Sequence, residues 1–450
     1  MKSTATPRRL QRPARSLVAA LRQWLTPEVW KQAHQARGRE RSSRWSVQPL
    51  VLVLLLASWC CGDSAAERFE TAKAFCTVCL AKRRRPGKTV QGFQKALAKL
   101  PMPVLRTVAT AVRQRLALAL ADRWLVDGFV PLGCDGTRLT CPRAAVLEKR
   151  LGQAGKAGSA PTVWLTALVH LRLGVPWAWQ WGKGTASERD HLRRLLPTLP
   201  AHALVVTDAG YVGYDLAKTL VERQVQFLMR VSSQATLFTA SAVAVERFHE
   251  GEVYYGPGAK SKQSSQQPLL PLRLIRVRDK KRKHDVWLLT NVERRRLSVA
   301  TASQMYRWRW ESEGLFRTYK RTLAKTKLVS RTVRLVHREA EGSLLATQLL
   351  LAQGALAMPR PKTLQPAAVS SPRQVLCVFR QELQAAAPKR RVGFAQRLHV
   401  AQRERRPRTS AKAKRVWLQR KEHRPPKPPR ILKLSEQQKV RIARQKQQAA

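Results

Sequence analysis

The chain has 450 residues, of which 44% are hydrophobic, and this is enough for two or three domains with sizeable cores. Lys and Arg number 85 against 28 Asp and Glu, so the net charge is +57 and a polyanionic partner is expected. Seven cysteines without a disulfide pattern exclude a disulfide-stapled scaffold and predict reduced thiols.

The N-terminal region lacks the features of a secretory or membrane segment. Its first apolar stretch is interrupted by Arg22, which argues against a signal peptide. The most apolar run, PLVLVLLLASWCC at 49–61, has 13 residues where a membrane span needs about 20. We therefore expect a buried helix there and an intracellular, cytoplasmic protein.

Residues 1–124 show helical spacing with basic turns such as KRRRPGK at 82–88. The segments predicted to be helical are 17–25, 51–61, 69–81, 89–100 and 104–125. A helical bundle of this kind suits DNA recognition through a helix in the major groove, and it equally suits dimerisation or packing.

Two aspartates follow strand-like apolar runs. The run 130–134 leads into Asp135 and a Gly-Thr pair, and the run 203–207 leads into Asp208 and an Ala-Gly pair. An aspartate at such a place can simply cap the next turn, and for either residue alone that explanation is at least as good as a functional one.

A third polar group lies in YRWRWESEGLFRTYK. Tyr306, Arg309, Glu313 and Lys320 are separated by three, four and seven residues. At 100° per residue of α-helix they fall within roughly 60° of one another and predict one polar face. The alternative is a solvated amphipathic helix with internal salt bridges.

Asp135, Asp208 and Glu313 together supply three carboxylates from two strands and a helix. Such hard oxygen ligands are those that Mg²⁺ or Mn²⁺ requires. The set therefore predicts a metal site, although each member alone does not.

On these residues the chain resembles the DDE transposases of bacterial insertion sequences, whose catalytic core is RNase H-like. The resemblance rests on the DGT at Asp135, on TDAGYVGYDL at Asp208, and on the Tyr-x2-Arg-x3-Glu-x6-Lys signature that ends at Lys320. It covers roughly residues 125–345. Thr137 replaces a common serine, and Ala209 replaces a common arginine, which puts one substrate contact in doubt.

The order of predicted elements agrees with an α/β fold of this kind. Residues 125–231 read as β-β-β-α-β-α-β, a mixed sheet with helices against it. The resemblance then implies that Asp135 and Asp208 lie near the ends of adjacent strands. The 105 residues between Asp208 and Glu313 leave room for a β-rich insertion at about 233–300, which in the family contacts the transposon end.

Four regions follow. We expect a helical end-binding region at 1–124, a catalytic domain at 125–345, a helical region at 346–388 and a basic tail at 389–450. The tail holds 21 Lys and Arg against three Glu, and its composition predicts disorder until it meets nucleic acid. Counterion release would supply most of its affinity.

The resemblance implies a DNA transposase that acts through two Mg²⁺ or Mn²⁺ ions held by Asp135, Asp208 and Glu313. Arg309 and Lys320 would bind DNA phosphates, Tyr306 would contact a phosphate or the terminal nucleotide, and Trp308 would stack on a base. The partners would be terminal inverted repeats, target DNA and a second copy in the synaptic complex, and the location the bacterial nucleoid.

Two sequence patterns that could indicate another cofactor are incomplete. Cys76-x-x-Cys79 lacks a second ligand pair for zinc, and GQAGKAGS has Ala157 where a phosphate loop needs Ser or Thr, so neither zinc nor a nucleotide cofactor is expected. A metal-dependent nuclease of the same fold, or a non-catalytic nucleic-acid-binding derivative of a transposase, stays open as an alternative.

Overall fold

The structure is a computed structural model that describes residues 14–38, 45–81, 85–153, 158–257, 267–279, 284–359, 370–384, 392–402 and 427–449. The chain divides into two compact units. The first, called the helical unit, comprises residues 1–125, 136–187 and 311–404. The second, called the sheet unit, comprises residues 126–135, 188–310 and 405–450.

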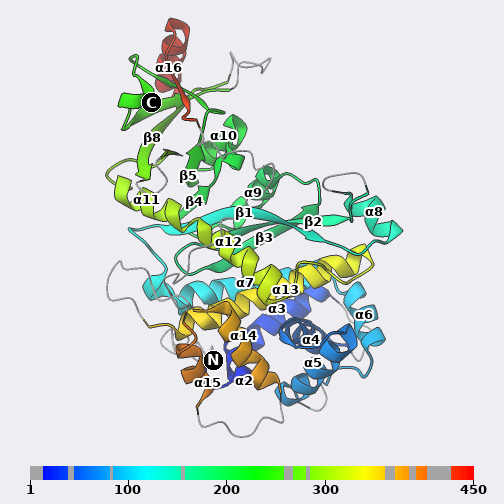
Figure 1. The fold of residues 1–450 in the computed structure, drawn as a ribbon. Coiled ribbons are helices and arrows are strands. Elements are labelled where there is room, and N and C mark those ends of the chain that lie inside the picture. The colour runs from blue at the N-terminus through cyan, green and yellow to red at the C-terminus, as the bar shows by residue number, and fades with distance from the viewer. Residues whose placement is uncertain are drawn as a thin grey trace, which may run out of the picture. The chain divides into compact units, whose positions relative to one another are not determined.

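The N-terminal part of the helical unit is helical, as predicted (Figure 1). Its helices are α2 (Leu17–Trp24), α3 (Pro27–Arg37), α4 (Val47–Trp59), α5 (Ala65–Cys79), α6 (Val90–Lys99), α7 (Met102–Ala119) and the short η2 (Ala121–Arg123). Only α3 was not among the predicted segments. Helix α4 is buried on nearly every side, which confirms the predicted buried helix. Among the described residues, no helix is long and apolar enough to cross a membrane.

The centre of the helical unit is α13 (Val333–Ala357), with α14 (Pro372–Leu383) and α15 (Phe394–His399) packed beside it. Helix α13 approaches α4 closely, because a Cβ added at Gly342 would lie 2.3 Å from Leu54 Cδ2. Trp59 Nε1 also donates to the carbonyl of Ala346 at 3.1 Å. The apolar side chains of α4 are therefore buried by packing against another long helix.

The unit boundary falls inside β1 (Val130–Thr140), after Asp135. In the helical unit, β1 is followed by α8 (Ala145–Leu151), which was not predicted, and by the antiparallel pair β2 (Thr162–His170) and β3 (Val175–Lys183). Gln348 on α13 donates to the carbonyl of Pro176 at 2.9 Å, which ties the central helix to this hairpin.

In the sheet unit, the first part of β1 pairs in parallel with β4 (Ala203–Thr207), and β4 pairs in parallel with β5 (Gln226–Val231). Two helices connect these strands, α9 (Glu188–Leu195) and α10 (Tyr214–Glu222), with the short turns η3 (Leu196–Thr198) and η4 (Ala209–Tyr211). The predicted mixed α/β arrangement is thus confirmed.

The predicted β-rich insertion consists of β6 (Thr236–Thr239), η5 (Val245–Arg247), β7 (Glu250–Tyr255), β8 (Leu270–Asp279) and β9 (His284–Thr290). It continues the main sheet, because β9 pairs antiparallel with β5. The strand order is β10-β6-β7-β8-β9-β5-β4-β1-β2-β3. Helix α11 (Val299–Trp308) follows and packs on β8. The sequence KKRK at 280–283, between β8 and β9, lies outside the described residues.

The basic tail is only partly as expected. Residues 403–426 lie outside the described part of the chain, but residues 427–449 form β10 (Arg430–Lys433) and α16 (Glu436–Ala449). Strand β10 pairs in parallel with β6, at the edge of the sheet. Leu434 and Ile442 are buried with Tyr254 and Leu269. The prediction of disorder is therefore wrong for 427–449, whose few apolar side chains pack on the sheet unit, and for 392–402, where α15 buries Phe394 and Leu398.

Candidate active site

The two aspartates come together through the register of neighbouring strands. Residues Val130 to Gly133 of β1 pair with Ala203 to Val206 of β4, in parallel. Two further residues along each strand bring the chain to Asp135 and to Asp208. Neighbouring strands lie about 4.8 Å apart, so this register places the two carboxylates at one level on adjacent strands.

Asp208 caps the short turn that follows β4 with one of its two carboxylate oxygens. It is the N-cap of η4, and its Oδ1 accepts a hydrogen bond from the amide of Gly210 at 2.9 Å. A Cβ at position 210 would lie 3.1 Å from that same oxygen, which explains the glycine. The turn is held from α9 by Arg189, whose Nε and Nη2 donate to the Gly210 carbonyl at 3.2 and 3.1 Å. The capping role predicted as an alternative is real, and it also fixes the direction of the carboxylate.

A third strand adds a cation at the same level. Thr207 of β4 pairs with Met229 of β5, so the next residues are Asp208 and Arg230. The charged side chain of Arg230 lies within electrostatic range of the Tyr306 hydroxyl on α11 and acts to lower its pKa. Sequence reasoning missed Arg230, although an arginine inside the otherwise apolar strand QFLMRV was a usable signal.

Tyr306 lies among three charged groups of the sheet unit. Burial raises the pKa of its hydroxyl, while Arg230 and Arg309 oppose that rise and Asp208 adds to it. The phenol therefore stays neutral at physiological pH and keeps a proton to donate.

Arg309 pairs with the first aspartate. Its Nη1 lies 3.6 Å from Asp135 Oδ2, and the two side chains are only 9% and 18% exposed. The guanidinium also lies over the ring of Trp310, 5.1 Å from its centroid. Arg309 is thus held by both a charge and an aromatic face.

The prediction of one continuous helical face across residues 306–320 is wrong. Helix α11 ends at Trp308, and Arg309 bonds three residues back to Tyr306. Helix α12 (Trp310–Arg317) follows, and the π-helical turn η6 (Thr318–Thr322) ends with a bond from Leu323 N to Thr318 O. A tighter turn and then a wider one change the rotation per residue, so 100° steps do not relate these side chains.

Two neutral, buried side chains neighbour the aspartates in the sequence, since Cys134 precedes Asp135 and Tyr211 follows Asp208 by three residues. The thiol of Cys134 donates to the hydroxyl oxygen of Tyr211 at 3.4 Å, and both side chains are almost fully buried. Burial raises the pKa of both groups, and the charges of Asp135 and of Glu188, at the start of α9, raise it further. These groups stay protonated, and sequence reasoning missed Glu188 as a nearby acid.

The other predicted site residues are placed as follows. Glu313 on α12 and Lys320 on η6 belong to the helical unit, and both are half-buried. Burial lowers the pKa of Lys320. Trp308 on α11 belongs to the sheet unit and is also half-buried. Of the predicted set, the sheet unit therefore brings together Asp135, Asp208, Tyr306 and Arg309 by itself.

The donor set of the sheet unit fits a hard divalent cation. Within the described ranges, no three His, Cys, Asp or Glu side chains are grouped so as to hold a metal ion by themselves. Mg²⁺, however, is usually bound by one or two protein carboxylates, with water and substrate phosphates completing the octahedron. Asp135 and Asp208, at one level on adjacent strands, match that requirement.

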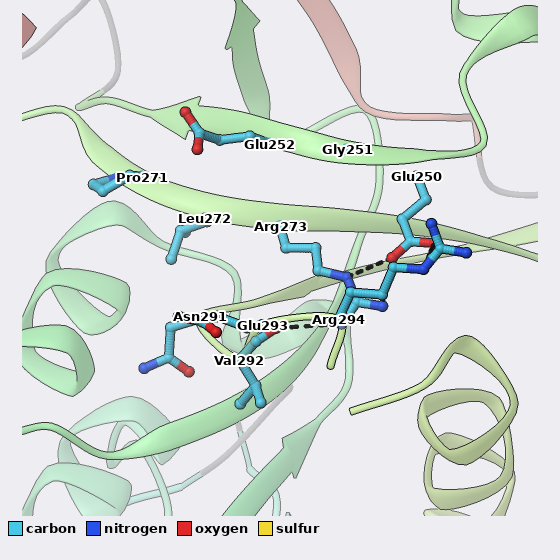
Figure 2. A pocket seen from close by; sticks show the side chains of 10 residues that line it. All are labelled: Glu250, Gly251, Glu252, Pro271, Leu272, Arg273, Asn291, Val292, Glu293 and Arg294. Atoms are coloured by element: carbon cyan, nitrogen blue, oxygen red, sulfur yellow. Dashed lines mark hydrogen bonds and ion pairs between the residues drawn. The ribbon is translucent and has the colours of Figure 1, made fainter. Parts of the chain in front are cut away.

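A second concave feature of the sheet unit has a different character. A cavity of about 400 Å³ lies between β7, β8 and the segment after β9 (Figure 2). Arg273 crosses it, donating to Glu250 through Nε at 2.7 Å and to the carbonyl of Leu297 through Nη1 at 2.7 Å. Arg273 and Arg294 both pair with Glu250, so this part of the cavity is a structural junction of the insertion.

A sheet that presents paired aspartates at the ends of neighbouring parallel strands, with arginines beside them, defines a class of α/β domain suited to metal-assisted phosphoryl transfer. Residues 134–349 match the family model described as "Transposase DDE domain". This match supports a DDE transposase with a DNA transposase function.

The solved structures that are similar to this chain include a transposase. The chain is similar to a piggyBac transposase, solved by cryo-EM as a synaptic complex with hairpin DNA, at 11% sequence identity and a TM-score of 0.42. The similarity covers 85% of this chain and 84% of that one. A search of curated proteins found no match.

Proposed function

We propose that this protein is a DNA transposase that cuts at the ends of a mobile element and joins them to target DNA. The observation that carries the proposal is the common level of Asp135 and Asp208 on neighbouring parallel strands, inside a segment that matches a transposase domain. The finer assignment, to insertion-sequence transposases with a Tyr-Arg-Glu-Lys signature, rests on residues 306–320 of the sequence.

Asp135 and Asp208, with Glu313 as the third carboxylate, would hold two divalent cations, Mg²⁺ or Mn²⁺. Bound there, such ions would activate water or a 3′-hydroxyl and stabilise the leaving oxygen. The chain's own residues do the positioning. Arg309 restrains Asp135, and the bond from Gly210 to Asp208 fixes the second carboxylate before any ligand arrives.

The substrate backbone would be held by cations on the same side as the acids. Arg230 and Arg309 present planar donor groups suited to phosphate oxygens, and Lys320 would add a point charge. Tyr306, which is neutral, would donate its hydroxyl proton to a phosphate oxygen. Trp308 would stack on a base near the cleaved end.

The proposal includes partners that follow from the reaction. Terminal inverted repeats and target DNA are the expected nucleic acids, and a homodimer would pair two ends in the synaptic complex. An origin in a bacterial insertion sequence, with action at the nucleoid, accompanies this assignment.

The experiment is cleavage and strand transfer by the full chain, with synthetic element ends and Mg²⁺ or Mn²⁺. We expect wild-type protein to nick the ends and to join the 3′-ends to a target plasmid. Asp135→Asn and Asp208→Asn should each lower the rate about a thousandfold or more, since each removes a charged ligand worth several kcal/mol in the transition state.

Both variants keep an oxygen at the same place, so the cap on η4 and the affinity for DNA should persist. Cleavage without any joining would favour the nuclease alternative. Binding without cleavage by wild-type protein would favour the non-catalytic derivative.

A further inference from the structure

The helical unit contains a long stretch without acidic residues. Between Glu70 and Asp122 the sequence has 11 Lys and Arg and no Asp or Glu. Helices α6 and α7 both lie in this stretch, and both pack against α13. Helices α6 and α7 therefore bring to their common surface with α13 a positive charge that no acidic residue of the same stretch balances.

The start of α13 brings more cations to that surface. Arg338 donates through Nε and Nη2 to the carbonyl of Leu100, at 2.9 and 2.7 Å, which fixes it beside the C-terminal end of α6. Lys99 directly precedes Leu100 and is exposed. Arg334 is exposed one turn before Arg338 and interacts with it electrostatically.

Helix α7 contributes to the same place. Arg106 is exposed, and it lies within electrostatic range of His337 on α13, whose pKa is lowered by burial and by Arg338 and Arg106, so that this imidazole is neutral. The four cations Lys99, Arg106, Arg334 and Arg338 are called the cationic cluster below. Three helices thus present like charges together, which costs free energy unless an anion is bound.

The acidic residues nearest to the cluster are turned inward. Glu339 is 8% exposed, and it accepts from the amides of Val329 and Ser330 and pairs with Lys325. Glu341 is 3% exposed; burial raises its pKa, and Arg106 and Arg338 act against that rise. The first turn of α13 holds no acid, although the helix dipole would favour one.

We propose that the cationic cluster binds the phosphate backbone of duplex DNA. This deepens the proposed function, because it rests on DNA being the substrate, and it places a contact on the helical unit apart from the acidic site. Within the described residues, α6 and α13 carry none of the exposed large apolar side chains, and α7 carries Leu118, twelve residues from Arg106, so the surface around the cluster lacks what insertion into a membrane requires. The contact is with phosphates, and it carries no sequence preference.

The test is the salt dependence of DNA binding by Arg106→Gln/Arg334→Gln in the full chain. Fluorescence anisotropy with a labelled duplex is measured over a range of KCl concentrations, for an element end and for an unrelated sequence. We expect the slope of log K against log salt to become shallower by about 2, since each lost phosphate contact removes about 0.9. The loss should be equal for both duplexes.

The matched control is Arg22→Gln/Arg373→Gln, which removes the same charge from exposed positions on α2 and α14. Its slope should equal that of wild type. Thermal unfolding should show that both double variants fold.

A wild-type slope in the cluster variant would overturn the proposal, and so would equal changes in the cluster and control variants. A selective loss of binding to phosphatidylglycerol vesicles, with DNA binding unchanged, would assign the surface to membranes and would also overturn it. Cleavage by wild-type protein is scored separately. If the slope changes as expected but no strand is cut, the surface stands and the catalytic proposal fails.

Discussion

Arg309 Nη1 lies 3.6 Å from Asp135 Oδ2, and both groups belong to the sheet unit. From the sequence, the acidic partner considered for Arg309 was Glu313, four residues later on the expected helix. The observed partner comes instead from a strand 174 residues earlier. A cation therefore already neutralises one of the two carboxylates that would hold a metal ion.

This pair leads to a prediction about Arg309→Gln. Removing the guanidinium abolishes a repulsion between it and an incoming divalent cation, so half-maximal thermal stabilisation should require less Mg²⁺ than in wild type. Cleavage should nevertheless fall about a hundredfold, as expected for one lost charged donor at a reacting phosphate. Thermal shift against Mg²⁺ concentration, measured beside cleavage, checks both effects.

Arg307→Gln is the control, because Arg307 is exposed on α11 and two residues away. It should leave both readouts near wild type. Weaker Mg²⁺ stabilisation in Arg309→Gln would show that the arginine supports the metal site, contrary to this reading.

A second prediction concerns the interaction between the charged side chain of Arg230 and the hydroxyl of Tyr306. Arg230→Gln, Tyr306→Phe and the double variant form a cycle measured by urea unfolding. A coupling of about 1 kcal/mol is expected, because each single change removes the same interaction between a cation and a phenol oxygen. Effects that add within about 0.3 kcal/mol would mean that the two side chains do not interact in solution.

A third prediction concerns acid stability and His170. Its Nε2 contacts the carbonyl of Trp124 at 2.9 Å and so carries the proton, while Nδ1 is buried without a hydrogen-bond partner. Burial lowers the pKa of His170 to about 4, well below the value near 6.5 of an exposed histidine.

Between about pH 4 and pH 6.5, His170 is therefore protonated in the unfolded chain and neutral in the folded chain. Stability should be complete above about pH 6.5 and fall by about 3 kcal/mol as the pH drops to about 4. His170→Gln keeps a donor for the Trp124 carbonyl and should flatten this dependence. Equal pH dependence of the unfolding free energy in both proteins would contradict the assignment.

A fourth prediction concerns the C-terminal strand and helix. Ile442 is 9% exposed in the cluster with Tyr254, Leu269 and Leu434. Ile442→Ala should destabilise the sheet unit by about 2 kcal/mol, the lower end of the range for such truncations in a core. Val440→Ala is the control, since Val440 is 52% exposed on the same helix and should change stability little.

Urea unfolding of both variants measures the difference. Equal stabilities would show that α16 does not pack on the sheet unit in solution. The result also bears on truncations of the tail, because removing 427–450 would take away packed structure together with its charge.

The local structure follows from patterns that are visible in the sequence. Apolar runs at 130–134, 203–207 and 226–231 are strands because short, nearly continuous apolar segments suit strands that are buried on both faces of a parallel sheet. The long N-terminal helices and the buried α4 follow equally from their spacing. The two aspartates were recognisable because each follows such a run and precedes a turn.

The contacts between these segments follow from the three-dimensional fold and not from any local pattern. The register of β1, β4 and β5 aligns Asp135, Asp208 and Arg230, which are separated by 73 and 22 residues, and no local pattern encodes that alignment. The ion pair of Arg309 with Asp135 also joins segments that are distant in the sequence. The same is true of the packing of Leu434 and Ile442 with Tyr254. Contacts between distant segments depend on which surfaces remain unpaired once the sheet has formed, and this is a property of the whole fold.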